Sequence, residues 1–419
     1  MTTFNQLSKI AFYQGKTFFS KDVVKKILIF LFIFCVFVSY LKPNYIVLAE
    51  DNDTENLQAE LEETIYSQLE NLDLAKIESV LKGLGDDQLE VFGVSSFGDK
   101  VKKIVSGEFA DGQQSIFKAI INLIFDDVLT FVPLLASIII ISILCGFLSN
   151  LKSDSSGKGV GDIIHFVCYG VVISIVMTAV VNLIQMTGKT INGLRSQMEV
   201  VFPLLLTIMT AIGGTMSVSI YQPAVALLSS AIMHIFTSVL MPIFIFSIVF
   251  TIISNLTSTV KLEKFTKFFQ STFKWIIGGI FTIFMAFLSI QGITASTYDG
   301  VSIRTAKYAI RSYVPILGGY LSEGFDVIMA SSVLIKNAIG ASGLLLMFSS
   351  IISPIVKIVV FILVLKLAAA ILEPLTDPRI SDFIYTVSKS LSMLIVMILG
   401  VAFMYLITVG LIMCTANFV

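Results

Sequence analysis

The last long apolar run of the chain, Leu391–Met413, reads LSMLIVMILGVAFMYLITVGLIM and contains no charged residue. Its length fits the roughly 20 residues that an α-helix needs to cross the hydrocarbon core of a bilayer. In lipid, every backbone N–H and C=O group must be satisfied within the protein, and a helix does this by itself. The stretch therefore predicts a membrane-spanning helix, and it decides the fold class.

Similar apolar runs recur upstream, and the composition agrees with them. The chain has 56% hydrophobic and 14% charged residues, whereas soluble domains carry roughly 25% charged residues. Two runs are too long for one span and are interrupted, one at Pro242 and one at Pro354. We expect an all-α polytopic transmembrane helical bundle over residues 128–419, with about seven to nine spans, some broken or re-entrant. The upstream runs are Val128–Ser149, Ile163–Ile184, Val200–Ile220, Ala224–Ile253, Trp275–Thr297 and Ile339–Leu372.

Residues 1–49 have the pattern of an export signal. The basic stretch Lys21–Lys26 precedes the apolar run Ile27–Leu41, which is short for a membrane span. Val47, Leu48 and Ala49 then offer a small-residue cleavage site. An uncleaved N-terminal anchor is the alternative, and in both cases the residues that follow are exported.

Residues 50–127 form the expected exported domain, the one water-soluble stretch of the chain. They contain 18 acidic residues and six lysines. Leucine and isoleucine recur there at three- or four-residue spacing from Leu57 to Leu72, which predicts an amphipathic helix ending near Gly83. Shorter helices are expected over 97–105 and 113–125. Such a small helical domain has a marginal core, so we expect it to lean on partners or on the membrane.

Charge predicts the orientation, because lysine-rich loops face the cytoplasm. The loop with Lys152 and Lys158 is expected inside, and residues 189–199 outside. The most basic loop should also lie inside. That placement requires an odd number of crossings within residues 200–253, either one re-entrant segment plus one span or three spans. The most basic loop contains Lys261, Lys264, Lys267 and Lys274.

No pattern of a catalytic or cofactor site stands out. His165 and His234 lie on separate apolar runs without metal-binding spacing. Gly157-Lys158 fails the phosphate-loop pattern, because the required glycine five residues earlier is absent. The four cysteines form no C-x-x-C pair and predict neither a zinc site nor a disulfide framework. We expect no enzymatic activity, no metal, no cofactor and no nucleic-acid partner. The cysteines are Cys35, Cys145, Cys168 and Cys414.

Proline and glycine interrupt two apolar regions in a similar order. Pro203 precedes Gly213 and Gly214, and Pro315 precedes Gly318 and Gly319; Pro223 follows the first pair. Backbone groups freed at membrane depth must face protein or a water-filled cavity, and paired interruptions mark the transport path in transporter folds. These residues are therefore candidates for broken helices or for lining a path. The alternative is that both residue types are simply frequent in membrane helices.

A second candidate feature is a polar helical face. Arg304, Lys307 and Arg311 stand at i, i+3 and i+7, with Asp299 and Asp326 as candidate counter-charges. One interpretation is an interfacial helix whose cations reach lipid headgroups; the other is an aqueous route or a partner contact. Lys336 lies in apolar sequence, where an ionisable side chain usually faces the bundle interior.

The order and spacing of several blocks closely resemble the stage III sporulation protein AE family, essentially over the whole chain. The blocks are Pro203…Gly213-Gly214…Gln222-Pro223, Gln291-Gly292…Asp299-Gly300…Arg304-Thr305-Ala306-Lys307, Val314-Pro315…Gly318-Gly319 and Leu334–Gly340. The resemblance implies a protein of the mother-cell membrane around the forespore, in a multiprotein channel needed for late forespore gene expression.

The same resemblance implies particular partners. They are the other stage III A-operon proteins, including a cytoplasmic ATPase and ring-forming proteins, and a forespore membrane protein. The acidic domain would lie between the two membranes, and the chain itself is a candidate homo-oligomer. A stand-alone secondary transporter is the alternative function. An intramembrane enzyme is a more distant one.

Overall fold

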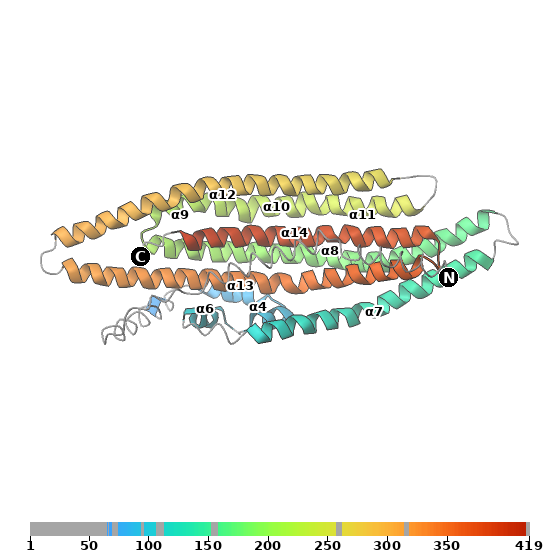
Figure 1. Cartoon of the computed structure of the whole chain (residues 1–419), viewed down its shortest axis with the longest axis horizontal. Coiled ribbons are helices and arrows are strands. Elements are labelled where there is room, and N and C mark those ends of the chain that lie inside the picture. The colour runs from blue at the N-terminus through green and yellow to red at the C-terminus, as the bar shows by residue number, and fades with distance from the viewer. Residues whose placement is uncertain are drawn as a thin grey trace, which may run out of the picture.

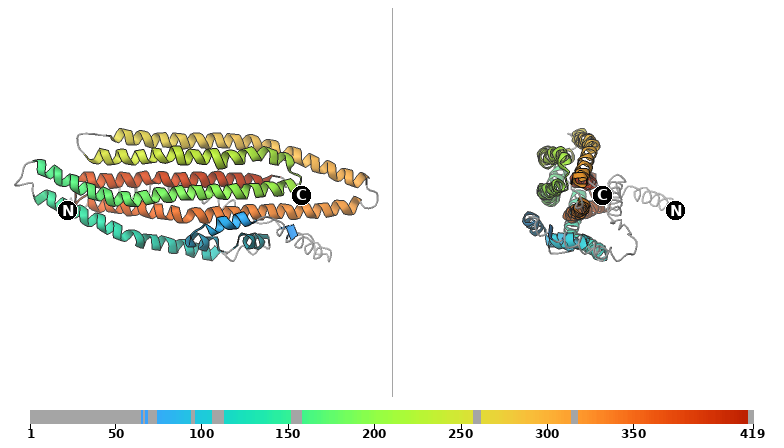
Figure 2. Two further views of the ribbon diagram at one scale, coloured as in Figure 1. Left: turned by 180° about the vertical axis from the view of Figure 1, so that it is seen from behind. Right: turned by 90° about the vertical axis from the view of Figure 1, so that its left-hand side faces the viewer.

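The computed structural model describes residues 74–93, 96–105, 113–151, 158–256, 262–313 and 318–415, together with residues 65, 67 and 68. Every regular element in these residues is a helix, which confirms the all-α fold class. The long helices lie side by side as an elongated bundle (Figure 1), and the views from behind and from one end show the same arrangement (Figure 2). The export signal and its run Ile27–Leu41 lie outside the described residues.

Five long helices form the body of the bundle. Three of them have 54, 51 and 55 residues, which at 1.5 Å per residue makes each about 80 Å long. Continuity over this length satisfies the backbone hydrogen bonds without loops. The helices are α7 (Gln113–Leu151), α8 (Lys158–Ala211), α12 (Glu263–Tyr313), α13 (Gly318–Leu372) and α14 (Pro378–Cys414).

A sixth long element is composite. It runs through α9 (Thr215–Ala226), the π-helical turn η2 (Leu227–Ile232), α10 (Met233–Ile235), the π-helical turn η3 (Phe236–Leu240) and α11 (Met241–Leu256). Pro223 lies inside α9 without ending the helix. Proline removes one backbone donor from the helical ladder, and the widened turns of η2 follow it within one turn of helix.

Six helices of the described residues are long and apolar enough to cross a membrane, by length and composition. The sequence predicted about seven to nine spans for the whole chain. The difference arises where one continuous helix stands in place of two expected spans. The six are Lys118–Phe147, Phe166–Ala211, Ser230–Asn255, Glu263–Ser289, Gly324–Leu372 and Pro378–Cys414.

Gly213 and Gly214 form the turn that reverses α8 into α9. Gly213 has φ +84°, in the left-handed region. Its N–H donates to the carbonyl of Thr210, and the N–H of Gly214 donates to that of Met209. These two bonds make a Schellman motif, in which glycine avoids the steric cost of a left-handed residue. The helix is therefore broken at these glycines, as expected, but the break is a reversal and not a re-entrant segment: the glycines end α8 and begin the antiparallel α9.

Residues 189–199, which the sequence predicted to lie outside the membrane, are not a loop, because α8 passes through them without interruption; on which side they lie stays a prediction. Val200–Ile253 accordingly holds one reversal, at Gly213, rather than a re-entrant segment or three spans. The ends of α8, α11 and α14 still meet. Tyr169 donates its hydroxyl to the Ile252 carbonyl at 2.9 Å, and its ring packs edge-on against Phe383.

We call the end of the bundle where these contacts lie the basic end, and the opposite end, with the Gly213 turn and the last residues of α14, the distal end. The end of α7, the start of α8, the end of α11, the start of α12 and the turn after α13 all lie at the basic end (Figure 1). The helix ends that flank the lysine-rich segments therefore lie together, as charge required, although by a different path. Described cations of the basic end are Lys158, Lys264, Lys267 and Arg379.

Three short helices of the acidic segment pack against the bundle. They are α4 (Ala75–Lys82), α5 (Asp86–Phe92) and α6 (Phe97–Val105), and α6 confirms the helix expected over 97–105. Glu78 of α4 accepts from the backbone N–H of Phe97 at 2.8 Å, which places a carboxylate at the N-terminus of α6 where the helix dipole favours it. Phe92, Phe97 and Val101 are buried in the main core. The helix expected over 113–125 is the first part of α7.

Cys145 of α7 and Cys168 of α8 form a disulfide, with their Cα atoms 5.8 Å apart. The expectation that the cysteines form no disulfide is therefore wrong for this pair. The two residues are 23 positions apart and become neighbours only because α7 and α8 form an antiparallel hairpin. Next to them, a Cβ on Gly146 would lie 2.7 Å from the carbonyl oxygen of Leu375, so α7 passes very close to the turn between α13 and α14.

Replacing Gly146 with Ala should therefore destabilise the basic end. The added methyl meets a backbone oxygen that cannot rotate away, and overpacking of this kind costs roughly 1–3 kcal/mol. We expect a lower midpoint in thermal unfolding of the detergent-solubilised protein. Gly170→Ala is the matched control, because a Cβ there meets nothing within 4 Å. Equal midpoints for the two variants would contradict the close approach.

Candidate functional site

Helix α13 carries the polar contacts that join distant parts of the chain. The polar side chains that make these contacts, buried except for the partly exposed Lys357, face other parts of the protein. We call this row of residues the α13 seam. Because a polar group in an apolar interior must find a partner, each contact specifies which neighbour packs at which height. The α13 seam comprises Ser331, Ser332, Lys336, Ser350 and Lys357.

Lys336 is the most buried ionisable side chain of the seam, with 0% exposure. Its ammonium donates to the backbone carbonyl of Thr415, the residue that caps the C-terminus of α14. The last carbonyls of a helix have no partner within it and carry its partial negative charge. A lysine there supplies a donor and a favourable charge at once, so Lys336 fixes the end of α14 against α13.

Tyr221 of α9 completes this contact. Its hydroxyl lies 3.0 Å from the Thr415 hydroxyl, which itself donates to the Leu411 carbonyl. Tyr221 is therefore the donor. Burial raises the pKa of the Tyr221 hydroxyl above its usual value, and the hydrogen bond to Thr415 lowers it by less. The hydroxyl thus keeps its proton at neutral pH, and three helices meet at Thr415.

Ser350 joins α13 to α8 and to the acidic segment. Gln197 of α8 donates its amide to the Ser350 hydroxyl at 2.6 Å, and Gln88 of α5 donates to the Ser350 carbonyl at 2.9 Å. Gln88 also accepts from the N–H of Gly85 at the start of α5. Ser350 therefore fixes the positions of α5 and α8 along the axis of α13.

A cluster of acidic and basic side chains lies two turns beyond Ser350 along α13. Lys357 lies 3.6 Å from the carboxylate of Asp87 on α5. The carboxyl of Asp127, which is buried on α7, interacts electrostatically with the same lysine. Three elements thus contribute one charged group each. The partial exposure of Lys357 and Asp87 makes their pair a weak one in energy but a specific one in position.

The predicted broken-helix residues are not brought together into one site. Pro203 is exposed on a continuous α8, and Pro223 is exposed on α9. Gly213 and Gly214 form the distal turn. Pro315 lies outside the described residues, between the end of α12 and the start of α13. Gly318 and Gly319 are the first residues of α13. Their role in lining a path stays a prediction.

The predicted polar face lies on helix α12. Asp299, Arg304, Lys307 and Arg311 all fall within its continuous helical backbone, so their shared face follows from the spacing; their side chains lie outside the described residues. Asp326 is half-buried on α13. Lys336 makes a buried hydrogen bond on α13.

Sequence reasoning missed Tyr221, Thr415, Gln88 and Gln197. The side-chain amides of Gln88 and Gln197 belong to no recognised sequence motif. A tyrosine in an apolar run, such as Tyr221, is usually interpreted as a core residue. The available signal is weak: each is a hydrogen-bonding side chain on an otherwise apolar helical face. The contacts of the α13 seam join helices of the same chain to one another. Among the described residues, no group of His, Cys, Asp and Glu could hold a metal ion.

Comparison with known proteins identifies the family. The family model of stage III sporulation protein AE matches residues 95–416, which include α6 and every long helix. The chain belongs to the stage III sporulation protein AE family. A curated relative, stage III sporulation protein AE of Bacillus subtilis (strain 168), is 25% identical over 315 residues, covering 75% of this chain and 79% of the relative. No solved structure matches the chain. The chain is thus a sporulation membrane protein.

Tyr221→Phe tests the contact at Thr415. Loss of the hydroxyl removes a buried hydrogen bond and should lower the free energy of unfolding by about 1 kcal/mol. The loss should be constant between about pH 6 and 9, because neither the folded nor the unfolded tyrosine ionises there. Above this range the unfolded chain loses its proton first, so the stability of the parent falls as pH rises. Chemical unfolding in detergent measures both effects.

Tyr385→Phe is the control for that variant, since Tyr385 is exposed on α14. It should leave the unfolding free energy within about 0.5 kcal/mol of the parent. If the two phenylalanine variants unfold alike, Tyr221 does not hold the end of α14.

A zero-length carbodiimide cross-link tests the position of α5 on the bundle. The reagent couples a carboxylate to an amine in direct contact, and Asp87 and Lys357 lie 3.6 Å apart. We expect mass spectrometry of the intact membrane protein to find a peptide joining residues 87 and 357. Asp87→Asn should abolish it. A cross-link of Asp87 to other lysines alone would show that α5 is docked elsewhere.

Proposed function

We propose that the chain is a multi-pass component of the channel or secretion complex that connects mother cell and forespore, required for late forespore development. The observation that carries this proposal is the family match over residues 95–416. It covers the long helices of the bundle and α6 of the acidic segment, whereas α4 and α5 precede it.

The proposed location follows from the same family and from charge. The bundle would lie in the mother-cell membrane around the forespore, with the basic end in the cytoplasm. Helices α4–α6 would then lie in the space between the two membranes. Their contacts with α13 and α8 support a role as part of the bundle's outer surface, and their acidic residues remain available to an exported partner.

The proposed partners are the other stage III A-operon proteins, including a cytoplasmic ATPase and ring-forming proteins, with homo-oligomerisation as a further option. The chain would act without enzymatic activity of its own. Energy would come from the separate ATPase. The α13 seam supports this division of labour, because its polar groups hydrogen-bond within the bundle and hold it together.

A stand-alone secondary transporter is the second candidate. The observation that favours it is a set of ionisable side chains within candidate spans, Lys336, Lys366 and Asp326. Ionisable groups at membrane depth mark ion pathways in many transporters. The contact between Lys336 and the capping residue of α14 gives that lysine a structural role instead.

An in-frame deletion in the native organism tests the proposal. We expect normal vegetative growth and development that stops after engulfment, with loss of heat-resistant spores. Affinity isolation of the tagged chain from sporulating cells should recover the ATPase and ring-forming proteins of the operon. Normal spore yield, or a growth defect tied to one nutrient, would instead support the transporter.

Point variants separate the two candidates further. Lys366→Met and Asp326→Asn should each keep spore yield within a few-fold of the parent if the chain is a channel scaffold. A coupled transporter needs its ionisable groups, so either change should then abolish function. Lys389→Met, an exposed lysine of α14, is the matched control for loss of one charge. Immunoblots of the membrane fraction confirm equal amounts of each variant.

A further inference from the structure

The long helices of the bundle are much longer than a membrane is thick. Helix α8 has 54 residues and α13 has 55, about 80 Å each, whereas the hydrocarbon core is about 30 Å thick. Tilt cannot absorb this difference, since membrane helices are tilted by about 20° on average. More than half of each helix must therefore lie outside the hydrocarbon, and its exposed residues should show where.

Along α8, the exposed side chains change character near residue 182. Between Phe166 and Val181 the exposed large side chains are apolar: Phe166, Val167, Val171 and Val181. From there to the distal turn, no large hydrophobic side chain of α8 is exposed. The exposed residues there are Asn182, Gln185, Lys189, Asn192, Ser196, Glu199, Pro203, Thr207, Thr210 and Ala211.

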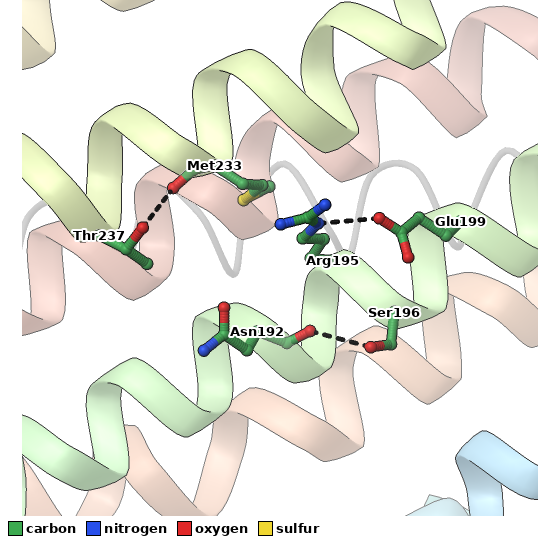
Figure 3. Close-up of polar contacts among 6 residues, drawn as sticks. All are labelled: Asn192, Arg195, Ser196, Glu199, Met233 and Thr237. Carbon is green, nitrogen blue, oxygen red and sulfur yellow. Dashed lines mark hydrogen bonds and ion pairs between the residues drawn. The ribbon is translucent and has the colours of Figure 1, made fainter.

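An ion pair lies on this polar part of α8. Arg195 and Glu199 are 2.8 Å apart and nearly half-exposed. Figure 3 shows the two side chains on α8, joined by the dashed line of their ion pair. An arginine and a glutamate on the lipid face would be costly in hydrocarbon. In water the same pair is ordinary.

The exposed side chains of the composite helix change from apolar to polar at the corresponding level. Its exposed residues from Val239 to Ile253 are large and apolar: Val239, Ile245, Phe246, Val249 and Ile253. On the distal side they are mostly small or polar, including Ser219, Gln222, Ser230, His234 and Ser238. Met216 and Leu227 are scattered exceptions of the kind found on any water-exposed surface.

Helix α12 carries features of a membrane interface near the same level. Trp275 is 80% exposed and follows Lys274, and because Phe269 packs against Phe246 and Phe250, Trp275 lies close to the level of Val239. Phe265 and Phe268 are exposed two to three turns nearer to the basic end. Tryptophan and lysine together mark the headgroup region. Helix α7, which does not reach the distal end (Figure 2), exposes large apolar side chains from Ile121 to Phe147. Asp126 and Asp127 lie within this stretch, and Asp127 is buried.

We propose that the bilayer encloses only the half of the bundle next to the basic end. The distal half, from about Gln185 on α8 and Ser238 on the composite helix, stands in water. The exposed apolar side chains are thus in contact with a lipid bilayer. The outer edge of this bilayer lies near residue 182 of α8. The apolar sequence of α14 does not contradict this, since Tyr405, Val409 and most of its distal residues are buried by other helices.

Spin labels on the full-length protein in nanodiscs of phosphatidylethanolamine and phosphatidylglycerol test the boundary. Single cysteines replace exposed residues in a Cys35→Ser, Cys414→Ser background: Val171→Cys and Phe246→Cys in the apolar band, Ser196→Cys and Gln222→Cys in the distal half. The readout is the accessibility of each nitroxide to oxygen, which enriches in hydrocarbon, relative to a water-soluble nickel chelate. Each variant must keep the parent's unfolding midpoint.

We expect the oxygen-to-nickel ratio to be several-fold higher at 171 and 246 than at 196 and 222. Four equally high ratios would overturn the proposal, because lipid would then cover the distal half as well. Four equally low ratios would overturn it too, since the apolar band would not face lipid.

The half-embedding does not depend on the proposed function, whereas the side on which the distal half emerges does. An impermeant maleimide applied to spheroplasts tests the side. It should label Ser196→Cys without lysis and Lys267→Cys only after lysis. The reverse pattern would overturn the proposed orientation, and the nanodisc result would still decide the embedding.

Discussion

Helices α8, α12 and α13 are continuous over 54, 51 and 55 residues, and the other features of the bundle follow from that continuity. A straight helix carries its own hydrogen bonds, so the chain needs few turns and places them all at the two ends. The basic loops collect at one end and the Gly213 turn at the other. Side chains far apart in sequence can then meet at fixed heights along α13.

The polar contacts of α13 specify these heights. Apolar packing between long helices would allow neighbouring registers of similar energy, whereas a buried amide or ammonium is costly unless it reaches its partner. Lys336 at Thr415 fixes α14, and Ser350 fixes α8 and α5. Close approach adds to this, because a Cβ on Gly343 would lie 2.8 Å from Val201. The result is a rigid body that can carry the acidic helices on its side.

The sequence predicts the helical class, the apolar runs and helix α6 because these depend on local composition and period. It does not predict the path of the chain between the runs. Gly213 and Gly214 are indistinguishable in sequence from a mid-membrane break, and their role as a turn is decided by the antiparallel packing of α8 and α9. Cys145 and Cys168 likewise pair through a hairpin that no local pattern announces.

The continuity of α8 through residues 189–199 can be measured directly. Spin labels at Val171→Cys and Thr207→Cys lie on one exposed face, ten turns apart. Double electron–electron resonance in nanodiscs should give a narrow distribution at about 54 Å, the length of 36 residues of α-helix. A break at 189–199 that sends the chain back through the bilayer would place the labels within about 30 Å of each other, and it would contradict the account.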